Sequence, residues 1–371
     1  MNGTFCNLAS GTLLEQSVMS QNKLVLVPLA VVCSVITAFT IVVNLMLIIA
    51  LVRSRSQETR QAPGKHGITQ MLMTSMAVSD FIFGVFLMPL GVVEITTNGV
   101  WDFGDGFCYT RILLNNLLCS VSIFHLNFLA LDRILAVYKP LWYRLRTAKT
   151  GALMVSISWT VPIVSILFFE VVSLQHVSLQ IFQEPEVVTV IIINFFIPLS
   201  ISYILYVALI MKIVIYNLQT RNKNNNRQSQ FSAHNDNAGA FNFEQPNNFN
   251  TNATNLSLVS LVNMPSHNSS ISSLVTDQTN AQLGNVSINK KTRQRMFKAL
   301  RTIGSLVVAY TVCWLPSWIS PPIISVDHLP MWYVMFLCWM GYFNSAINPL
   351  LCCFNVSVRR AVKLFLHVKV C

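Results

Sequence analysis

The sequence contains few charged residues. Asp, Glu, Lys and Arg make up 11% of its 371 residues, against about 25% in an ordinary soluble domain. Hydrophobic residues make up 53% and gather in long runs. This composition excludes a typical soluble enzyme and indicates that a lipid bilayer surrounds much of the chain.

The sequence also lacks the patterns of several other functions. Its nine cysteines form no Cys-x-x-Cys pair and no regular Cys/His spacing, so we expect no zinc site and no cofactor. Its 25 Lys and Arg residues are not interleaved with aromatic residues, so we expect no nucleic-acid partner. No nucleophile stands beside a general base, and we predict that the chain is not an enzyme.

Seven stretches are long and apolar enough to cross a bilayer as helices. No internal repeat accompanies them, which disfavours a membrane transporter built from repeated halves. The predicted fold class is an all-α membrane protein, a seven-transmembrane helix bundle. The seven stretches are Leu24–Val52, Ile68–Val93, Phe107–Val137, Ala152–Phe169, Val187–Ile215, Thr302–Ile324 and Trp332–Phe354.

The basic residues are distributed unequally between the two ends of these stretches. All Lys and Arg except Lys23 and Arg111 lie at the ends and connections of one side, which the positive-inside rule assigns to the cytosol. We therefore expect a multi-pass protein of the plasma membrane with its N-terminus outside and its C-terminus in the cytosol. Asn2 is then a candidate glycosylation site and Cys371 a candidate palmitoylation site. Met1–Asn22 lacks the apolar core of a signal peptide, so the first helix is expected to direct insertion.

Composition divides the chain further. A long segment rich in Asn, Ser and Gln cannot bury enough apolar surface to order itself, and bases alternate with apolar residues after the seventh stretch as in a helix lying on the inner leaflet. The expected parts are residues 1–23, the extracellular N-terminus; 24–216, helices one to five; 217–289, a disordered cytosolic third loop; 290–354, helices six and seven; and 355–371, the amphipathic helix and a short tail.

Asp80 lies in the middle of the second stretch, which contains no base. An ionisable residue at such a depth is costly and indicates function. Neutral oxygens for the same site are offered by Ser122, Asn344, Ser345 and Asn348. Hard cations take oxygen ligands, so the pattern indicates a site for a small cation. The alternative is a protonated Asp80 that only hydrogen-bonds neighbouring helices.

A second acid, Asp132, stands beside Arg133 at the cytosolic end of the third stretch. A neighbouring carboxylate can hold a guanidinium at the membrane edge through charge-assisted hydrogen bonds. Taken alone, the pair is equally consistent with an interfacial contact that fixes the depth of the helix.

The order of short motifs along the chain is more specific. The motifs are Asn44, Ala77-Val-Ser-Asp80, Trp101-Asp-Phe-Gly, Cys108, Asp132-Arg133-Ile134, Trp159, Phe195-Phe-Ile-Pro198, Tyr206, Cys313-Trp-Leu-Pro316 and Trp339-Met-Gly-Tyr342-Phe-Asn-Ser-Ala-Ile-Asn348-Pro349. In this order the chain resembles the rhodopsin-like G-protein-coupled receptors, and within them the biogenic-amine branch that includes the trace-amine-associated receptors. The resemblance covers all seven stretches.

The resemblance implies a receptor with a small-molecule ligand, a heterotrimeric G protein and arrestin as partners. It implies an allosteric sodium ion at Asp80, Ser122, Asn344, Ser345 and Asn348. It implies that coupling and activation involve Asp132, Arg133, Tyr206, Ile123, Pro198, Tyr310, Asn348 and Pro349. It implies a ligand pocket lined by Arg111, Asn115, Asn116, Cys119, Asn194, Trp314, Ser317, Trp318, Trp339 and Tyr342.

The chain departs from the amine receptors at the ligand end of the third helix. Their ammonium-binding Asp is replaced by Asn115, and an amide cannot supply the charge-assisted bond. Arg111 lies one turn above on the same face, where it would repel amines and attract carboxylates. In the alternative interpretation Arg111 turns to the outer surface and pairs with Asp102, Asp105 or Glu94. We expect a ligand other than the common amines.

Other departures affect the disulfide and the cytosolic end. Cys108 occupies the family's disulfide position, yet the outer loop Glu170–Glu186 contains no cysteine, so Cys108 either pairs with Cys6 or stays free. Cys352 replaces the usual Tyr after Pro349. The acid expected on the sixth helix is replaced by a stretch containing Arg295, Met296 and Lys298. These changes favour raised basal signalling or weak coupling, and they leave a non-signalling partner or scaffold as an alternative function.

Overall fold

All regular secondary structure that the computed structural model describes is helical, as predicted. The described residues are 23–61, 67–97, 101, 103–139, 143, 145–175, 189, 192–237, 294, 297, 300–317, 319 and 331–367. The chain divides into two compact units, one formed by Met1–Ile210 with Lys298–Cys371 and the other by Met211–Phe297.

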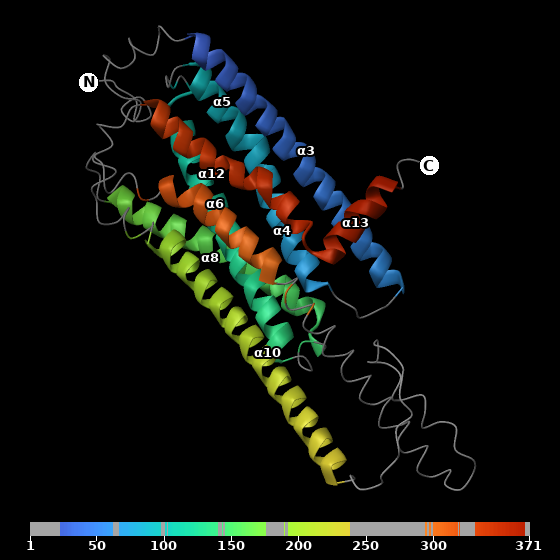
Figure 1. Cartoon of the computed structure of the whole chain (residues 1–371). Coiled ribbons are helices and arrows are strands. Elements are labelled where there is room, and N and C mark those ends of the chain that lie inside the picture. The colour runs from blue at the N-terminus through green and yellow to red at the C-terminus, as the bar shows by residue number, and fades with distance from the viewer. Residues whose placement is uncertain are drawn as a thin grey trace. The chain divides into compact units, whose positions relative to one another are not determined.

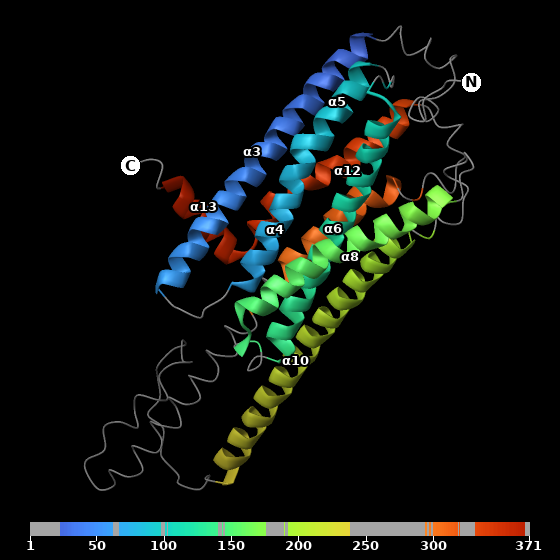
Figure 2. The same cartoon turned by 180° about the vertical axis from the view of Figure 1, so that it is seen from behind.

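The helices follow the predicted stretches closely (Figures 1 and 2). Residues 301–317 form a helix at the place of the sixth stretch. The others are α3 (Lys23–Gln61), α4 (Ile68–Ile82), the π-helical segment η1 (Phe83–Leu87), α5 (Met88–Thr96), α6 (Asp105–Tyr138), α8 (Ala148–Gln175), the π-helical segment η2 (Ile192–Phe196), α10 (Ile197–Asn237), α12 (Met331–Cys352) and α13 (Val356–His367).

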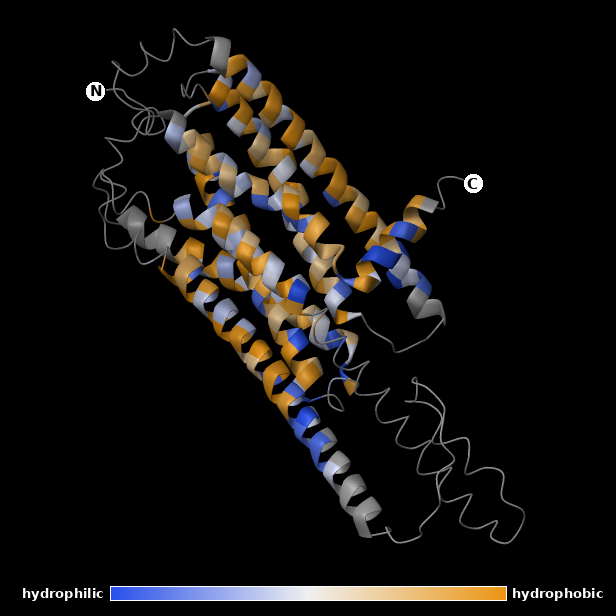
Figure 3. Cartoon of the chain, in the orientation of Figure 1, coloured by the Kyte–Doolittle hydropathy of each residue, from blue (hydrophilic) through white to orange (hydrophobic). Residues whose placement is uncertain are grey.

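Among the described residues, five helical segments are long and apolar enough to cross a membrane. They are Leu26–Gln57, Ile68–Thr96, Gly106–Tyr138, Ala148–Phe168 and Ile192–Asn222. Apolar residues cover most of their length, whereas polar residues gather where α10 leaves this stretch and along α13 (Figure 3). Composition and length thus agree with the bilayer prediction.

The helices of the first unit expose apolar side chains on their outer faces. On α3, Val31, Val35 and Val42 are more than half exposed, while Cys33 and Leu51 are buried against neighbouring helices. Exposed apolar faces of this extent would promote aggregation in water. In lipid they are the favourable outer surface, and the backbone polar groups are satisfied within each helix.

Two π-helical segments stand directly before prolines. η1 ends one residue before Met88-Pro89, and η2 is followed by Ile197-Pro198. Proline lacks the N–H that the regular helix ladder requires, and a π turn lets the helix continue around the gap. The π segments mark where the regular helix ladder changes in the second and fifth helices.

The predicted start of the disordered third loop is wrong. α10 continues through residues 217–237 as helix to Asn237, because extension adds one hydrogen bond for each residue fixed once a helix is nucleated by the apolar turns before it. The polar composition that suggested disorder is compatible with a solvated helix. The rest of the predicted loop lies outside the described residues.

The amphipathic helix after the seventh stretch is present as α13. Asn355 caps its N-terminus, since Asn355 Oδ1 accepts a hydrogen bond from the Ser357 backbone N–H at 3.0 Å. Val358 and Phe365 are buried, whereas Arg359 is exposed. α13 packs on α3, so its apolar face belongs to the bundle and its basic face points away.

The centre of the first unit is a hydrophobic core shared by several helices. α3 packs on α4, α4 on α6 and α6 on α8, while α12 contacts α3 and α4. Trp314 of the sixth helix lies in this core with Phe83 of η1. Its six-membered ring lies directly against Gly341 of α12, so the absence of a side chain at Gly341 allows the two helices to approach.

Gly341→Ala is therefore expected to destabilise the fold. A Cβ at this position would lie 2.7 Å from Trp314 Cζ3, and overpacking of a buried ring costs about 1–3 kcal/mol. We expect a lower thermal unfolding midpoint for the purified protein in detergent. Gly106→Ala is the control, because nothing lies within 4 Å of the added Cβ there. An unchanged midpoint in Gly341→Ala would contradict this packing.

Candidate functional site

Asp80 is 1% exposed and hydrogen-bonds two residues of α12. Ser345 Oγ donates to Asp80 Oδ1 at 2.8 Å, and Asn348 Nδ2 donates to Asp80 Oδ2 at 3.0 Å. Asn44 of α3 joins the group, because its Nδ2 donates to the Ser345 carbonyl oxygen at 3.0 Å. The structure thus brings together residues of α3, α4 and α12 that are far apart in sequence.

Three amide oxygens of α3 and α12 have no hydrogen-bond donor among the described residues. The side-chain Oδ1 atoms of Asn44, Asn344 and Asn348 are all buried and unpaired. Ser122 is also buried, on α6, although no hydrogen bond links it to Asp80 among the described residues. Buried unpaired acceptors are costly, and carboxylate, amide and hydroxyl oxygens are the ligands that hard cations prefer. The residues present therefore fit a small hydrated cation.

No cluster of three His, Cys, Asp or Glu residues that could hold a metal ion is found in the described part of the chain. One carboxylate with neutral oxygen partners would suit a weakly held monovalent ion better than a transition metal.

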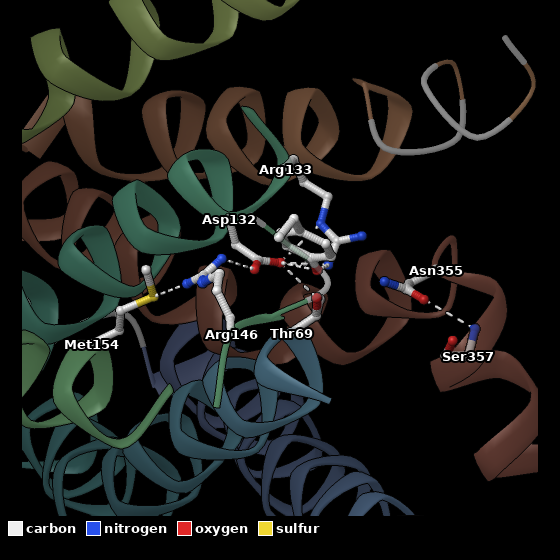
Figure 4. Close-up of polar contacts among 8 residues, drawn as sticks. Thr69, Asp132, Arg133, Arg146, Met154, Asn355 and Ser357 are labelled. Atoms are coloured by element: carbon white, nitrogen blue, oxygen red, sulfur yellow. Dashed lines mark hydrogen bonds and ion pairs between the residues drawn. The ribbon is translucent and has the colours of Figure 1, made fainter. Parts of the chain in front are cut away.

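Near the C-terminal end of α6, Asp132 is fully buried and accepts hydrogen bonds from several sides (Figure 4). Arg133 Nε donates to Asp132 Oδ2 at 3.1 Å, and Thr69 Oγ1 of α4 donates to the same oxygen at 2.7 Å. The Tyr143 hydroxyl lies 3.4 Å from Oδ2 and 3.5 Å from Arg133 Nη2. The predicted Asp132–Arg133 pair is thus part of a larger network.

Arg146 is a member of this network that the sequence analysis missed. Its Nη1 donates to Asp132 Oδ1 at 3.1 Å, its Nη2 contacts Met154 Sδ at 3.3 Å, and its side chain is 2% exposed. Asp132 therefore faces two guanidinium groups, one on each carboxylate oxygen. Nothing in the sequence distinguished Arg146 from the other bases of its loop, because its burial depends on contacts with Asp132 and Met154 that form only in the folded chain.

Tyr206 of α10 lies against Gly304 of the sixth helix. A Cβ at Gly304 would come within 2.5 Å of the Tyr206 hydroxyl oxygen. The close approach of these two helices therefore depends on the absence of a side chain at Gly304.

Three residues that the resemblance assigns to activation are buried. Ile123 and Tyr310 belong to the hydrophobic core, and Pro198 is buried on α10. The Tyr310 hydroxyl donates to the Cys119 carbonyl oxygen at 3.2 Å, and its ring stacks on Phe195 with centroids 5.9 Å apart. The buried phenol of Tyr310 therefore has the hydrogen-bond partner that its hydroxyl needs.

At the ligand end of α6, Arg111 forms an ion pair with Glu94 of α5. Its guanidinium also lies over the Trp101 ring, 5.2 Å from the centroid, and beside the Tyr342 hydroxyl. Of the two interpretations of Arg111, the pairing with an outer acid holds, and the acid is Glu94. Arg111 therefore does not present a free positive charge to a carboxylate ligand.

Asn115 lies one turn below Arg111 on α6, and its Oδ1 is buried without a hydrogen-bond donor. Phe83, Trp314, Trp339 and Tyr342 form an aromatic group. The ring centroids of Phe83 and Tyr342 lie 5.0 Å apart, and those of Trp339 and Tyr342 lie 5.4 Å apart. Phe83 was missed because π-helical η1 changes which residues of the second helix face inward.

The remaining predicted pocket residues have mixed roles. Asn194 Oδ1 accepts a hydrogen bond from Ser165 Oγ of α8 at 2.6 Å, and Ser317 Oγ donates to the Leu337 carbonyl oxygen at 2.9 Å. Cys119 is buried in the core. These side chains join helices in this structure. Asn116 is partly buried, and Trp318 lies outside the described residues.

Cys108 forms a disulfide, so the alternative of a free thiol is wrong. Its expected partner Cys6 lies outside the described residues, as do Asn2 and Cys371 and the basic stretch expected before the sixth helix. Cys352, at the position of the family's Tyr, is a free thiol and is fully buried.

The chain matches the family described as 7 transmembrane receptor (rhodopsin family) over residues 43–351. It is 26% identical over 324 residues to trace amine-associated receptor 8c of Mus musculus, which covers 82% of this chain and 78% of that receptor. It is 26% identical over 366 residues to 5-hydroxytryptamine receptor 1D of Oryctolagus cuniculus, and the match covers 92% of this chain and 89% of that receptor. It is 25% identical over 350 residues to trace amine-associated receptor 1 of Macaca mulatta, and the match covers 89% of this chain and 85% of that receptor. The chain therefore belongs to the rhodopsin family of seven-transmembrane G-protein-coupled receptors, as a multi-pass membrane receptor related to the amine receptors and not an enzyme.

Proposed function

We propose that this receptor lies in the plasma membrane with its N-terminus outside and transmits the binding of an extracellular small molecule to a heterotrimeric G protein. Arrestin is a further proposed partner. The observation that carries the proposal is the network around Asp132, which holds Arg133 at the end of α6 where basic residues place the cytosol.

In this mechanism the ligand shifts a population between two arrangements of the helices. Arg133 leaves Asp132 in the active arrangement and contacts the G protein, which binds in a groove between the cytosolic helix ends. Arg146 stays on the other oxygen of Asp132. Because the buried carboxylate keeps one guanidinium partner, the release of Arg133 costs less than it would for an isolated pair.

The ligand is proposed to differ from the common biogenic amines. At the position of the family's ammonium-binding Asp, Asn115 offers an uncharged oxygen, and Glu94 of α5 is already paired with Arg111. A desolvated ammonium would then lack a counter-ion, a loss of about 1.5–3 kcal/mol relative to a charged partner. The aromatic group around Tyr342 still offers surface to a small ring.

We also propose that sodium binds at Asp80 and stabilises the inactive arrangement. Asp80, Ser122, Asn344, Ser345 and Asn348 would hold the ion, which supplies a positive charge to a carboxylate that has no basic partner. The unpaired amide oxygens of Asn344 and Asn348 support this assignment, since a hydrated cation can satisfy both, whereas a protonated acid has a single O–H to donate.

The test is nucleotide exchange on purified G proteins of each class, measured with membranes that contain the native chain. We expect exchange above that of receptor-free membranes for at least one class. Replacing N-methylglucamine chloride by sodium chloride at constant ionic strength should lower the rate several-fold in the native chain, and this effect should disappear in Asp80→Asn.

Two results would count against these proposals. Sodium sensitivity that survives in Asp80→Asn would exclude the cation site. Exchange at the receptor-free level for every class would instead favour the alternative of a receptor-fold partner or scaffold that does not signal.

A further inference from the structure

The ion pair between Arg111 and Glu94 lies one turn above Asn115 on α6, the position at which the resemblance implies the ligand contact of the amine receptors. Resting on the proposed function, we propose that this pair and Asn115 recognise a zwitterion of the α-amino acid type, with an apolar or aromatic side chain. In this proposal both simple amines and simple carboxylic acids are poor ligands.

The first argument is the balance of charge. The side chains of Arg111 and Glu94 are 13% and 27% exposed, so the pair is partly desolvated and still reachable. A lone ammonium or a lone carboxylate would engage one member and draw it from the other, and an uncompensated charge in such a place is costly. A zwitterion compensates both members at once.

The second argument is the supply of free hydrogen-bonding groups. The ion pair uses one carboxylate oxygen, Glu94 Oε2, and one nitrogen, Arg111 Nη2. Among the described residues no hydrogen bond uses Glu94 Oε1, and a guanidinium has five N–H donors. A ligand ammonium can therefore bind Glu94 while its carboxylate binds Arg111, with the original pair kept.

The third argument is the position of the two partners. Trp101 holds one face of the guanidinium, and the Tyr342 hydroxyl lies beside it, so Arg111 is kept in place without further contacts to Glu94. One turn below, Asn115 Oδ1 is buried and lacks a donor. An ammonium carries three N–H donors, enough to reach Glu94 and Asn115 together.

The aromatic residues beside the pair indicate the nature of the ligand's side chain. A Cβ at Gly91, one turn before Glu94 on the same face of α5, would lie 3.0 Å from Tyr342 Cε2 and 3.4 Å from Trp339 Cζ2. The two rings thus lie on the face of α5 that carries Glu94. A bound zwitterion would place its side chain near apolar and aromatic surface.

The experiment compares three ligands that share a ring and differ only in charge, L-phenylalanine, phenethylamine and 3-phenylpropionate. A second series uses L-tryptophan, tryptamine and indole-3-propionate. Binding is read as the concentration dependence of the thermal unfolding midpoint of the purified native receptor, so no G protein is needed. In at least one series we expect the zwitterion to bind about tenfold more tightly than either singly charged ligand.

Variants test the assignment of each charge. Arg111→Gln should transfer the preference to the amine, Glu94→Gln should transfer it to the carboxylate, and the double variant should lose the discrimination. Thr110→Ala is the matched control, because Thr110 is exposed on α6 and its hydroxyl donates to the Gly106 carbonyl oxygen, and its preference should remain native.

A native preference for an amine or a carboxylate, no binding of either zwitterion, or an unchanged preference in both single variants would overturn the inference and leave the ion pair with a structural role only. These outcomes are separate from the proposed function, because nucleotide exchange is measured independently. A receptor that exchanges nucleotide without zwitterion binding loses this inference alone.

Discussion

Arg133→Ala is expected to reduce nucleotide exchange to the level of receptor-free membranes while leaving the amount of receptor at the cell surface close to native. The signalling loss follows from the proposed contact of the guanidinium with the G protein. The preserved fold follows from the structure, because Asp132 keeps Arg146 at 3.1 Å and Thr69 at 2.7 Å after Arg133 is removed. The buried carboxylate is then still paired.

The matched control for this prediction is Arg146→Ala, which removes the other guanidinium of Asp132. Arg146 is almost fully buried and contacts Met154, so its loss is expected to lower the thermal unfolding midpoint more than Arg133→Ala does. Surface amount is measured with an epitope tag, and exchange is measured per surface receptor. Exchange that persists at the native level in Arg133→Ala would contradict the receptor mechanism.

Asn115→Asp is expected to create a response to small aromatic amines such as tyramine and tryptamine. The native amide oxygen is buried and unpaired, so an aspartate there would be desolvated and would gain strongly from an ammonium partner. A charge-assisted hydrogen bond of about 2–3 kcal/mol corresponds to a gain of roughly a hundredfold in affinity. The gain should be larger when Arg111→Gln removes the positive charge one turn above.

The control is Thr110→Asp, which adds the same charge at an exposed position of α6. Dose–response curves for amine-stimulated exchange should shift in Asn115→Asp and stay native in Thr110→Asp. A native chain that responds to tyramine, serotonin, dopamine or histamine at nanomolar concentration would refute the argument, because another acid would then have to reach the ligand.

Much of the fold could be predicted because the relevant free energies are local. An apolar stretch such as Leu24–Val52 crosses a bilayer because of its own length and composition, and α3 follows it closely. The predicted start of the third loop was wrong for the opposite reason. Residues 217–237 continue a helix that the turns before them have already nucleated, and the average composition of the polar segment does not reveal this effect.

The candidate site could be predicted in part. Asp80 was evident as an acid without a base in its helix, and the hydrogen bonds from Ser345 and Asn348 agree with the predicted neighbours. Arg146 was not evident, because the sequence does not show which of the several basic residues in its loop pairs with Asp132. The π-helical turn at η1 also changed which residues of the second helix face inward, a shift that no regular helical period predicts.

The sequence by itself determined the membrane-spanning helices, the side on which the bases lie and the residue types available at each depth. These follow from the free energy of transferring each segment into lipid, which depends on composition alone. Only the tertiary structure decided that Arg111 pairs with Glu94 and that Asp132 receives a second guanidinium. Each pairing depends on the rotation of one helix against another and on the path of a loop, and those are set by packing between segments distant in the chain.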